Sequence, residues 1–252
     1  MTMSLSGRAA FISGAGHGIG RATARAMARL GATVGINDLK PEFVEDAVTE
    51  IRALGGRAIG LPCDVSTREG MREAVAQFVR DVGRLDIMVN NAAWVRYQPL
   101  AEITPEVMDR MVEIGFKSVI WGIQAAAEVM DPQRGGSIIN VASIAAFKSP
   151  MRSVVYSGIK AGVLGITRAS AADLGARNIR VNAVAPGAVP TEGTAKHRNA
   201  ELDARRIGRT PLGRLGTVED IADAICFLAG DGSRFFNADV LRLDGGASET
   251  SL

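Results

Sequence analysis

Seven short apolar, β-rich runs alternate with longer helical patterns along the whole chain of 252 residues. Strands that are separated by helices in this way form βαβ units, whose strands are parallel and lie in one sheet. Two of the runs, "IMVN" and "IINVAS", are continuously apolar, as expected for strands that helices cover on both faces. The chain therefore predicts an α/β fold of the doubly wound kind. The seven runs are "RAAFIS", "TVGIN", "RAIGLP", "LDIMVN", "SIINVAS", "IRVNAVAP" and "DVLRLD".

One domain is expected to span 1–252, because no linker, composition shift or internal repeat divides the chain and such folds commonly run to about 250 residues. Only the stretch from 187 to 215 lacks a strong pattern. It follows a strand and is too long for an ordinary connection. Loops of that length in compact domains tend to be lids or binding segments, so we expect a substrate lid at about 187–215.

Composition excludes several classes of function. Lys and Arg number 29 against 27 Asp and Glu and are scattered, so nucleic-acid binding is not indicated. The longest uncharged run, 135–147, is shorter than the roughly 18 apolar residues that a membrane span needs, and no leader pattern opens the sequence. A cytoplasmic location follows as the default. Cys63 and Cys226 are far apart in apolar surroundings, so neither a disulfide nor a metal cluster is expected.

A glycine-rich segment, "SGAGHGIG" at 13–20, lies between the first strand and the first helix, where a phosphate-binding turn belongs in a doubly wound fold. Its glycines are Gly14, Gly18 and Gly20, whereas the usual G-x-G-x-x-G fingerprint would need glycine at Ile19. An ordinary turn is the alternative, because strand-to-helix turns need glycine for purely steric reasons. The segment favours a nucleotide without proving one.

Asp38 ends the second strand about 20 residues beyond the glycine turn, where an acidic side chain can accept hydrogen bonds from the adenosine ribose hydroxyls. A carboxylate there would repel a 2′-phosphate, and the following residue, Leu39, is not basic. This pattern favours NAD over NADP. The alternative is that Asp38 only starts a turn before Pro41.

Tyr156 and Lys160 are four residues apart near the start of a helical pattern, "YSGIK", and therefore share one helix face. A neighbouring ammonium favours the phenolate and lowers the pKa of a tyrosine towards the working pH, which suits an acid/base. Y-x-x-x-K is also common as an exposed helical pair. The pair is therefore weak evidence when taken alone.

Together these motifs carry a family resemblance. "SGAGHGIG", "CDV", "NNAA", Ser143, "YSGIK", "APGAVPT" and "LDGG" follow in this order across essentially the whole chain. The combination resembles the classical short-chain dehydrogenases/reductases. The resemblance implies a single Rossmann-like domain with a seven-stranded parallel sheet flanked by helices, usually assembled as a homotetramer. It also implies a small-molecule alcohol or ketone substrate and NAD as the cofactor, without a metal.

The resemblance assigns roles residue by residue. Tyr156 would donate and accept the proton, Lys160 would bind the nicotinamide ribose and lower the pKa of the tyrosine, and Ser143 would hydrogen-bond the substrate oxygen. The cofactor-binding residues that the resemblance implies are Gly14, His17, Gly18, Ile19 and Gly20 in the turn, Asp38 and Leu39, Asp64 and Val65, Asn91, Tyr156, Lys160, Pro186, Gly187, Val189 and Thr191.

One departure from the family touches the proton relay. In "DRMVEIGFKSVIWGIQAA", Gly115 stands where the family carries an asparagine that helps to hold a relay water. The enzyme could be inactive, the alignment could be wrong, or the water could be held differently. We favour the third interpretation, because a glycine can still kink the helix and offer its carbonyl to a water. A glycine inside a helix otherwise costs about 1 kcal/mol relative to alanine.

Two functions follow. The leading one is an NAD-dependent oxidoreductase that interconverts a secondary alcohol and a ketone. The alternative is a catalytically silent NAD-binding sensor or partner subunit, supported by Gly115. Substrate-pocket candidates are Trp94, Ala145, Phe147, Pro150, Met151 and 190–209. Basic residues near them could receive an anionic group, although each alone is more simply a solvated surface charge. These are Arg96, Lys148, Arg152, Lys196 and Arg198.

Overall fold

A computed structural model describes residues 3–193 and 199–250 of the chain. Its seven strands form one sheet in the order β3-β2-β1-β4-β5-β6-β7, and all neighbouring strands are parallel. The predicted doubly wound α/β fold is confirmed. The strands are β1 (Ala9–Ile12), β2 (Thr33–Asp38), β3 (Arg57–Pro62), β4 (Ile87–Asn90), β5 (Gly136–Val141), β6 (Ile179–Pro186) and β7 (Val240–Leu243).

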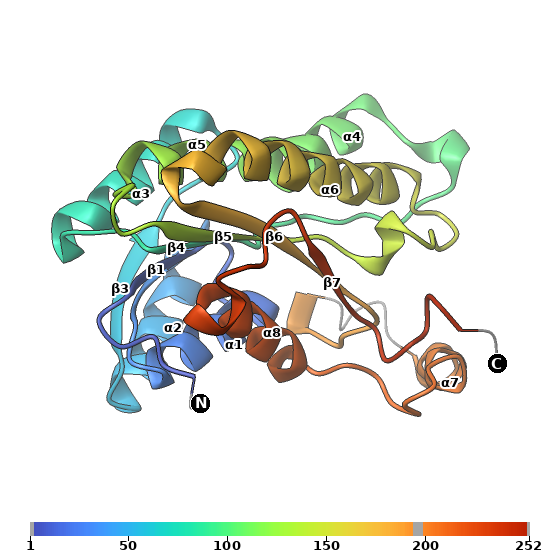
Figure 1. The fold of residues 1–252 in the computed structure, drawn as a ribbon. Coiled ribbons are helices and arrows are strands. Elements are labelled where there is room, and N and C mark those ends of the chain that lie inside the picture. The colour runs from blue at the N-terminus through green and yellow to red at the C-terminus, as the bar shows by residue number, and fades with distance from the viewer. Residues whose placement is uncertain (1–2, 194–198, 251–252) are drawn as a thin grey trace.

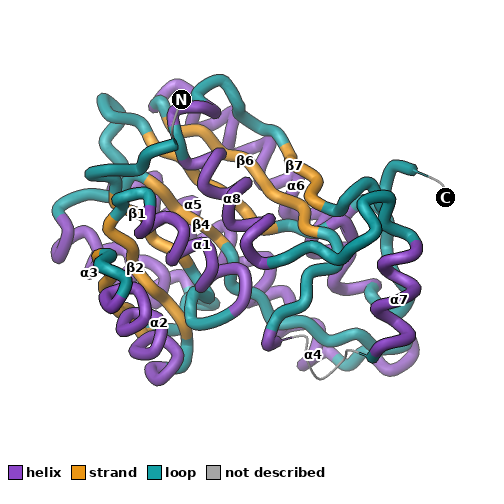
Figure 2. The backbone as a smooth tube through the Cα atoms, turned by 90° about the horizontal axis from the view of Figure 1, so that it is seen from below, coloured by secondary structure: helices purple, strands orange, loops and turns teal. Residues whose placement is uncertain are grey.

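Helices cover both faces of the sheet (Figure 1). One layer consists of α1 (Gly18–Arg29), α2 (Pro41–Ala53) and α8 (Val218–Ala229), which Figure 2 shows in front of the strands. The other layer consists of α3 (Arg68–Val82), α4 (Pro105–Val112), α5 (Ser118–Val129) and α6 (Val154–Leu174). Short 3₁₀ turns connect these elements at η1 (Leu100–Glu102), η3 (Ile144–Ala146), η4 (Gly175–Arg177) and η6 (Asp231–Ser233).

Each face of the sheet has its own apolar cluster, because successive residues of a strand point to opposite faces. On β1, the ring of Phe11 joins the cluster beneath α3 and packs edge-on against Phe78, with 6.2 Å between ring centroids. Its neighbours Ala10 and Ile12 join the cluster beneath α1 and α8. The continuous apolar runs of the sequence are therefore explained by burial on both sides.

Local signals place the helix ends. The hydroxyl of Thr67 accepts a hydrogen bond from the amide of Gly70 at 3.0 Å and caps α3. Thr217 and Asp220 form a reciprocal capping box at the start of α8, with bonds of 3.1 and 2.7 Å. Each cap satisfies amides that the first turn of a helix leaves unpaired. These caps set the lengths of the loops on which the strand-end residues lie.

The long helix expected around Gly115 is interrupted. A π-helical turn, η2 (Glu113–Lys117), separates α4 from α5 and contains the buried Gly115. The amide of Ser118 bonds the carbonyl of Glu113, five residues earlier, as a π turn requires. The regular bonding ladder is therefore broken at the position where the family asparagine is missing.

The predicted lid region contains a helix that the sequence pattern does not show. This helix, α7 (Ala200–Gly208), has no buried residue, so apolar periodicity could not reveal it. Asn199 caps it by accepting from the amide of Leu202 at 2.6 Å, and acidic and basic side chains occupy its first and last turns. Both ribbon views place α7 beside the C-terminal segment, and the amide of Leu212 donates to the carbonyl of Gly245 (Figures 1 and 2).

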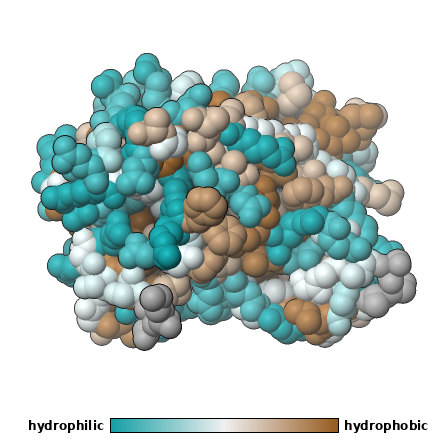
Figure 3. Space-filling model, in the orientation of Figure 1, coloured by the Kyte–Doolittle hydropathy of each residue, from teal (hydrophilic) through white to brown (hydrophobic). Residues whose placement is uncertain are grey.

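The face shown in Figure 3 is largely polar, with apolar side chains gathered in the middle of the view and at the upper right, where Figure 1 draws α4 and the start of α6. Exposed apolar residues in or near these two segments include Leu100, Met108, Met151 and Val154. Across residues 3–193 and 199–250, no helix has the length and apolar character to cross a membrane.

Candidate active site

The predicted site residues gather at one edge of the sheet, where the carboxyl ends of the parallel strands meet. Asp38 ends β2, Asn91 follows β4, Ser143 follows β5, and Gly187 follows β6. The strand order reverses between β1 and β4, and ligands of open α/β sheets bind outside the strand ends at such a switch point. The fold therefore brings residues from distant parts of the sequence to one place.

The glycine turn is packed tightly against the end of β4. Gly14 has a φ of +62°, and a Cβ there would lie 2.9 Å from the Cα of Ala92. The side-chain nitrogen (Nδ2) of Asn91 donates to the carbonyls of Ser13 and Gly14, both at 2.9 Å. A Cβ on Gly20 would lie within 2.3 Å of the Gly14 carbonyl oxygen. Steric packing alone is therefore sufficient to explain glycine at 14 and 20. This agrees with the alternative that the segment is an ordinary turn.

The start of α1 nevertheless shows the chemistry of an anion site. The amide of Gly18 donates to the Glu192 carboxylate at 3.1 Å. A carboxylate oxygen is a chemical stand-in for a phosphate oxygen, and helix N-termini favour both. Thr191 lies against the same turn, because a Cβ on Gly18 would be 3.4 Å from the Thr191 Cβ. The Gly18 amide at this helix start is therefore a donor that would fit a pyrophosphate oxygen.

Asp38 faces the glycine turn. Its carboxylate accepts from the amides of Gly16 and Lys40, both at 3.3 Å, and a Cβ on Gly16 would lie 2.8 Å from its Oδ2. Asp38 thus starts the local turn and also borders the nucleotide turn. Leu39 is 61% exposed.

The remaining predicted cofactor residues lie around this edge. His17 is exposed and packs edge-on against Phe43. Asp64 accepts from the amide of Ser66 at 2.9 Å, and Val65 is buried. Ile19 and Val189 pack against the cluster beneath α1 and α8. Pro186 ends β6, and the amide of Gly187 donates to the carbonyl of Leu243.

Ser143, Tyr156 and Lys160 converge although they come from two elements. Ser143 caps η3 directly after β5, and its hydroxyl accepts from the amide of Ala145 at 3.1 Å. Tyr156 lies in the first turn of α6. Lys160, one turn later, is buried and donates to the carbonyl of Val141 at 2.6 Å, with its Nζ 5.9 Å from the centre of the Tyr156 ring. The hydrogen bond from Lys160 to Val141 therefore joins α6 to the end of β5, close to Ser143 and Tyr156.

Burial controls the protonation of this cluster. It raises the pKa of Tyr156 above its ordinary value, and the hydrogen bond with Ser143 opposes that rise. Burial also lowers the pKa of Lys160 to about 8. Desolvation of the phenolate outweighs the Ser143 hydrogen bond, so the net shift of the Tyr156 pKa is upward. The expectation that Lys160 lowers the pKa of the tyrosine stays a prediction.

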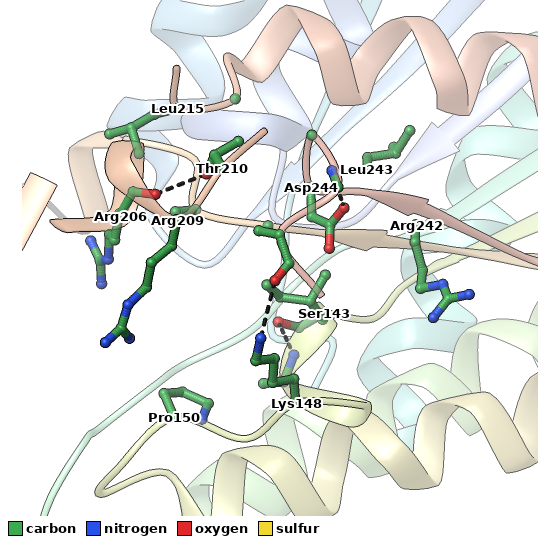
Figure 4. Close-up of a pocket in the computed structure, with 18 of the residues that line it drawn as sticks. Ser143, Lys148, Pro150, Arg206, Arg209, Thr210, Leu215, Arg242, Leu243 and Asp244 are labelled. Atoms are coloured by element: carbon green, nitrogen blue, oxygen red, sulfur yellow. Dashed lines mark hydrogen bonds between the residues drawn. The ribbon is translucent and has the colours of Figure 1, made fainter. Parts of the chain in front are cut away.

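A cavity of about 1130 Å³ opens beside Ser143 and Tyr156. The predicted Ala145, Lys148 and Pro150 line it (Figure 4). Trp94, Phe147, Met151, Arg96 and Arg152 are not among the residues that line it. Arg110 lies over the Trp94 ring at 4.3 Å, Arg242 lies over Phe147 at 5.1 Å, and Met151 is 89% exposed. Lys196 and Arg198 fall outside the described residues.

Sequence reasoning missed two parts of the pocket wall, Tyr97 and the residues after β7. Tyr97 packs edge-on against Tyr156, with 5.7 Å between ring centroids. Arg206 and Arg209 line the cavity within the predicted stretch 190–209, although no pattern predicted α7, the helix from which they come. Asp244, Gly245 and Gly246 follow β7. These last three could have been found by applying the strand-end rule to the seventh strand as well.

Gly115 lies against α6 at the residue before Lys160. A Cβ on Gly115 would be 3.2 Å from the Cγ2 of Ile159, and the Phe116 ring fills the space above Gly162. Ser118 donates to the carbonyl of Ile114 at 2.6 Å. The π turn thus packs closely on the helix that carries Tyr156 and Lys160, and it leaves little room for a side chain at 115.

A doubly wound parallel sheet whose first strand leads through a glycine turn into a helix defines the Rossmann-like class of α/β proteins. Within that class, the family profile described as Enoyl-(Acyl carrier protein) reductase matches residues 14–248. The chain belongs to the short-chain dehydrogenase/reductase family, as its motifs predicted. Its homologues are named dehydrogenases and reductases, which supports an oxidoreductase role.

Three relatives illustrate the range of the family. The chain is 37% identical over 244 residues to the 3-oxoacyl-[acyl-carrier-protein] reductase FabG of Thermotoga maritima, covering 97% of this chain and 99% of the relative. A 7α-hydroxysteroid dehydrogenase solved with NADH and a 7-oxo bile acid has a TM-score of 0.94 at 31% identity, covering 98% and 97%. A gluconate 5-dehydrogenase from Burkholderia cenocepacia J2315, solved with NADP and tartrate, has a TM-score of 0.93 at 32% identity, covering 99% and 98%.

Proposed function

We propose that this protein is an NAD(H)-dependent oxidoreductase that interconverts a secondary alcohol and a ketone, with Tyr156 as the acid/base. The observation that carries the proposal is the convergence of Ser143, Tyr156 and Lys160 beside a cavity at the carboxyl edge of the sheet.

The bound nicotinamide would supply or accept the hydride at the substrate carbon. Tyr156 gives its proton to the carbonyl oxygen during reduction and takes one from the alcohol during oxidation. Ser143 donates a hydrogen bond to the same oxygen and stabilises the charge that develops there. Lys160, fixed by the Val141 carbonyl, holds a positive charge near the phenol and favours its ionised form.

We propose NAD as the preferred cofactor. Asp38 is held beside the glycine turn by the Gly16 amide, where its carboxylate would accept from ribose hydroxyls and repel a 2′-phosphate. Leu39 adds no positive charge. The solved relatives named above bind NADH in one case and NADP in another, so the preference rests on this chain's own residues.

The competing function is a silent NAD-binding sensor or partner subunit, and Gly115 is the feature that favours it. The structure removes part of that argument, because the π turn keeps the helix irregular at Gly115 without an asparagine. We propose that a backbone carbonyl of this turn holds the relay water. Ser118 is already committed to the Ile114 carbonyl.

A homotetramer is proposed on family resemblance. The outer face of α6 is open at Gly158 and Gly165, where an added Cβ would meet nothing within 4 Å. Small residues there allow close contact between helices of two subunits. Light scattering coupled to size exclusion would give the mass of the assembly, and a monomer would contradict the proposal. A cytoplasmic location stays a prediction that cell fractionation tests.

Absorbance at the NADH band tests the function. Wild-type protein is mixed with NADH and a panel of ketones, or with NAD⁺ and the matching alcohols, beside Tyr156→Phe as the control. We expect turnover with at least one pair and a loss of about 10² to 10⁴-fold in the variant. NADH binding without turnover of any pair, together with turnover in Gly115→Asn, would favour the silent protein instead.

A further inference from the structure

The pocket beside Tyr156 has an unequal balance of charge. Five basic side chains and two carboxylates line it, and Figure 4 labels Lys148, Arg206, Arg209, Arg242 and Asp244 among them. The basic residues are Lys148, Arg206, Arg209, Arg214 and Arg242, and the acidic residues are Asp220 and Asp244. The contacts of each side chain determine whether its charge is already neutralised within the protein.

Two of the arginines have structural partners. Arg214 forms a two-pronged pair with the Asp220 carboxylate, at 2.6 and 2.9 Å, and that carboxylate also caps α8. Arg242 pairs with Glu249 and lies over the Phe147 ring. These contacts hold the C-terminal segment and the start of α8. Contacts within the chain therefore explain both arginines without a ligand.

Asp244 and Lys148 are fixed by backbone groups. The Asp244 carboxylate accepts from the amides of Gly246 and Ser248, at 2.9 and 2.8 Å, and so faces its own loop. Lys148 donates to the carbonyl of Ala247 at 3.2 Å. A carbonyl orients an ammonium without neutralising it, so Lys148 adds positive charge to the pocket.

Arg206 and Arg209 lie three residues apart at the C-terminal end of α7 and extend in the same direction, towards the loop that carries Pro150 (Figure 4). The Arg206 Nη1 forms an ion pair with the Asp203 carboxylate at 3.7 Å, a separation longer than a hydrogen bond, and the Arg206 side chain stays 45% exposed. Arg209 forms no ion pair with any carboxylate in the described part of the chain. Two guanidinium groups therefore face the same open part of the pocket.

Tyr97 links this arginine pair to the part of the pocket where the reaction would occur. Tyr97 packs edge-on against Tyr156, and burial and the Tyr156 phenol raise the pKa of Tyr97 while the Arg206 charge opposes that rise. Arg206 thus acts electrostatically on a ring that touches the catalytic candidate. A substrate bound at Tyr156 could extend towards the two arginines.

Solvation of surface charge is the ordinary explanation of exposed arginines. Here the neighbouring Arg205 provides the contrast, because it is exposed on the same helix and does not line the cavity. Guanidinium groups match carboxylate and phosphate oxygens in two-pronged geometry. A net positive wall that is placed opposite Ser143 and Tyr156 suits an anionic substrate better than a neutral one.

We infer that the alcohol or ketone is an anion, with a carboxylate or phosphate group that Arg206 and Arg209 bind at the α7 side of the pocket. This inference rests on the proposed function and adds the substrate class to it. Lys148 contributes long-range attraction. The reacting carbon then lies at Ser143 and Tyr156 while the anionic group is held at α7.

The test compares matched pairs of ketones with NADH. One series consists of oxo acids, such as 4-oxopentanoate and 5-oxohexanoate, each beside its neutral carboxamide. A second pair is dihydroxyacetone phosphate beside dihydroxyacetone. We expect kcat/KM to be at least about tenfold higher for the anionic member of the best pair, because a charge-assisted bond is lost in the neutral one. The series that shows the larger ratio identifies the group.

Variants assign this preference to α7. In Arg206→Gln/Arg209→Gln the ratio of anionic to neutral kcat/KM is expected to fall at least about tenfold, and in Arg205→Gln it is expected to persist. Neutral members that react as well as the anions, or a ratio that survives the double substitution, would overturn the inference.

A binding measurement separates this inference from the function. Calorimetric titration of 5-oxohexanoate and of dihydroxyacetone phosphate into the protein with NAD⁺, which cannot reduce a ketone, measures binding without turnover. At least about tenfold weaker binding of the better ligand in the double variant supports the arginine site. Absence of turnover would count against the oxidoreductase alone, whereas equal binding by wild type and variant would overturn the anion site.

Discussion

Burial disfavours the charged form of the Lys160 side chain. It is 4% exposed, and burial lowers its pKa from 10.5 to about 8. Keeping an ammonium in such a place destabilises the folded state wherever the lysine is protonated. The carbonyl of Val141, which accepts a hydrogen bond from its Nζ, does not neutralise it. Such a perturbed group in a cleft is typical of functional sites.

Lys160→Met is expected to change how stability depends on pH. Between about pH 8 and about pH 10 the unfolded chain keeps a proton on this lysine that the folded chain has lost, so the wild-type free energy of unfolding rises with pH through this group. The variant lacks that rise. Denaturant unfolding across this range measures the difference, with Lys40→Met, at an exposed lysine, as the control. Equal pH trends in wild type and Lys160→Met would contradict the buried charge.

Asp38→Ser is expected to relax the choice of cofactor. Removing the carboxylate removes both the acceptor for ribose hydroxyls and the repulsion of a 2′-phosphate. The ratio of kcat/KM for NADH over NADPH should exceed about ten in wild type and fall at least about tenfold in the variant. Glu42→Gln, an exposed neutralisation early in α2, is the matched control. An unchanged ratio in Asp38→Ser would show that Asp38 only starts its turn.

Glu192→Gln is expected to tighten NADH binding. The Glu192 carboxylate accepts from the Gly18 amide at 3.1 Å and so competes with a pyrophosphate for the start of α1. An anion at a helix start is worth about 0.3 to 1 kcal/mol, so Kd should fall about two- to fivefold. Fluorescence titration measures it, with Glu201→Gln in α7 as the control. Weaker binding in Glu192→Gln would mean that the carboxylate assists the cofactor.

At the scale of elements, the π turn and α7 are the two features that the sequence did not predict. Gly115 pointed to a departure in a long helix, but one residue type cannot distinguish a kink from a change of hydrogen-bond register. Helix α7 has no buried face, so only its Asn199 cap and its charged ends indicated it. Both features depend on contacts with α6 or with the C-terminal segment, which local patterns do not contain.

A double-mutant cycle tests the packing of the π turn. An added methyl group at 115 lies 3.2 Å from the Cγ2 of Ile159, so Gly115→Ala should be better tolerated when Ile159→Ala removes that contact. We expect the two changes to couple favourably, by about 1 kcal/mol in the free energy of unfolding.

Gly208→Ala, in α7, is the control for that cycle, because an added Cβ there meets nothing within 4 Å and the position lies outside the α6 face proposed for subunit contact. Alanine should stabilise this exposed helical position by about 0.5 to 1 kcal/mol, independently of Gly115. Additive effects of Gly115→Ala and Ile159→Ala would mean that the π turn does not press on α6.

At the scale of the whole molecule, strand periodicity predicted the seven parallel strands and the strand-end rule placed the glycine turn, Asp38, Asn91 and Ser143 at one edge. The rule succeeds because parallel strands all end on the same side of the sheet. The sequence predicted the stretch that carries Arg206 and Arg209 as part of the pocket, but it could not predict which of its side chains line the cavity, since that depends on how α7 lies beside the segment after β7. The sequence also could not predict the direction of the Tyr156 pKa shift, because burial determines it.

Deuterium transfer tests the central claim most directly. NADH deuterated at the transferable position is mixed with wild-type protein and the ketone, and the product alcohol is examined by mass spectrometry. We expect one deuterium on the carbinol carbon in wild type and none above background in Tyr156→Phe, which should still bind NADH. Binding of NADH by wild type with no deuterium in the alcohol from any ketone would contradict a catalytic role for this site.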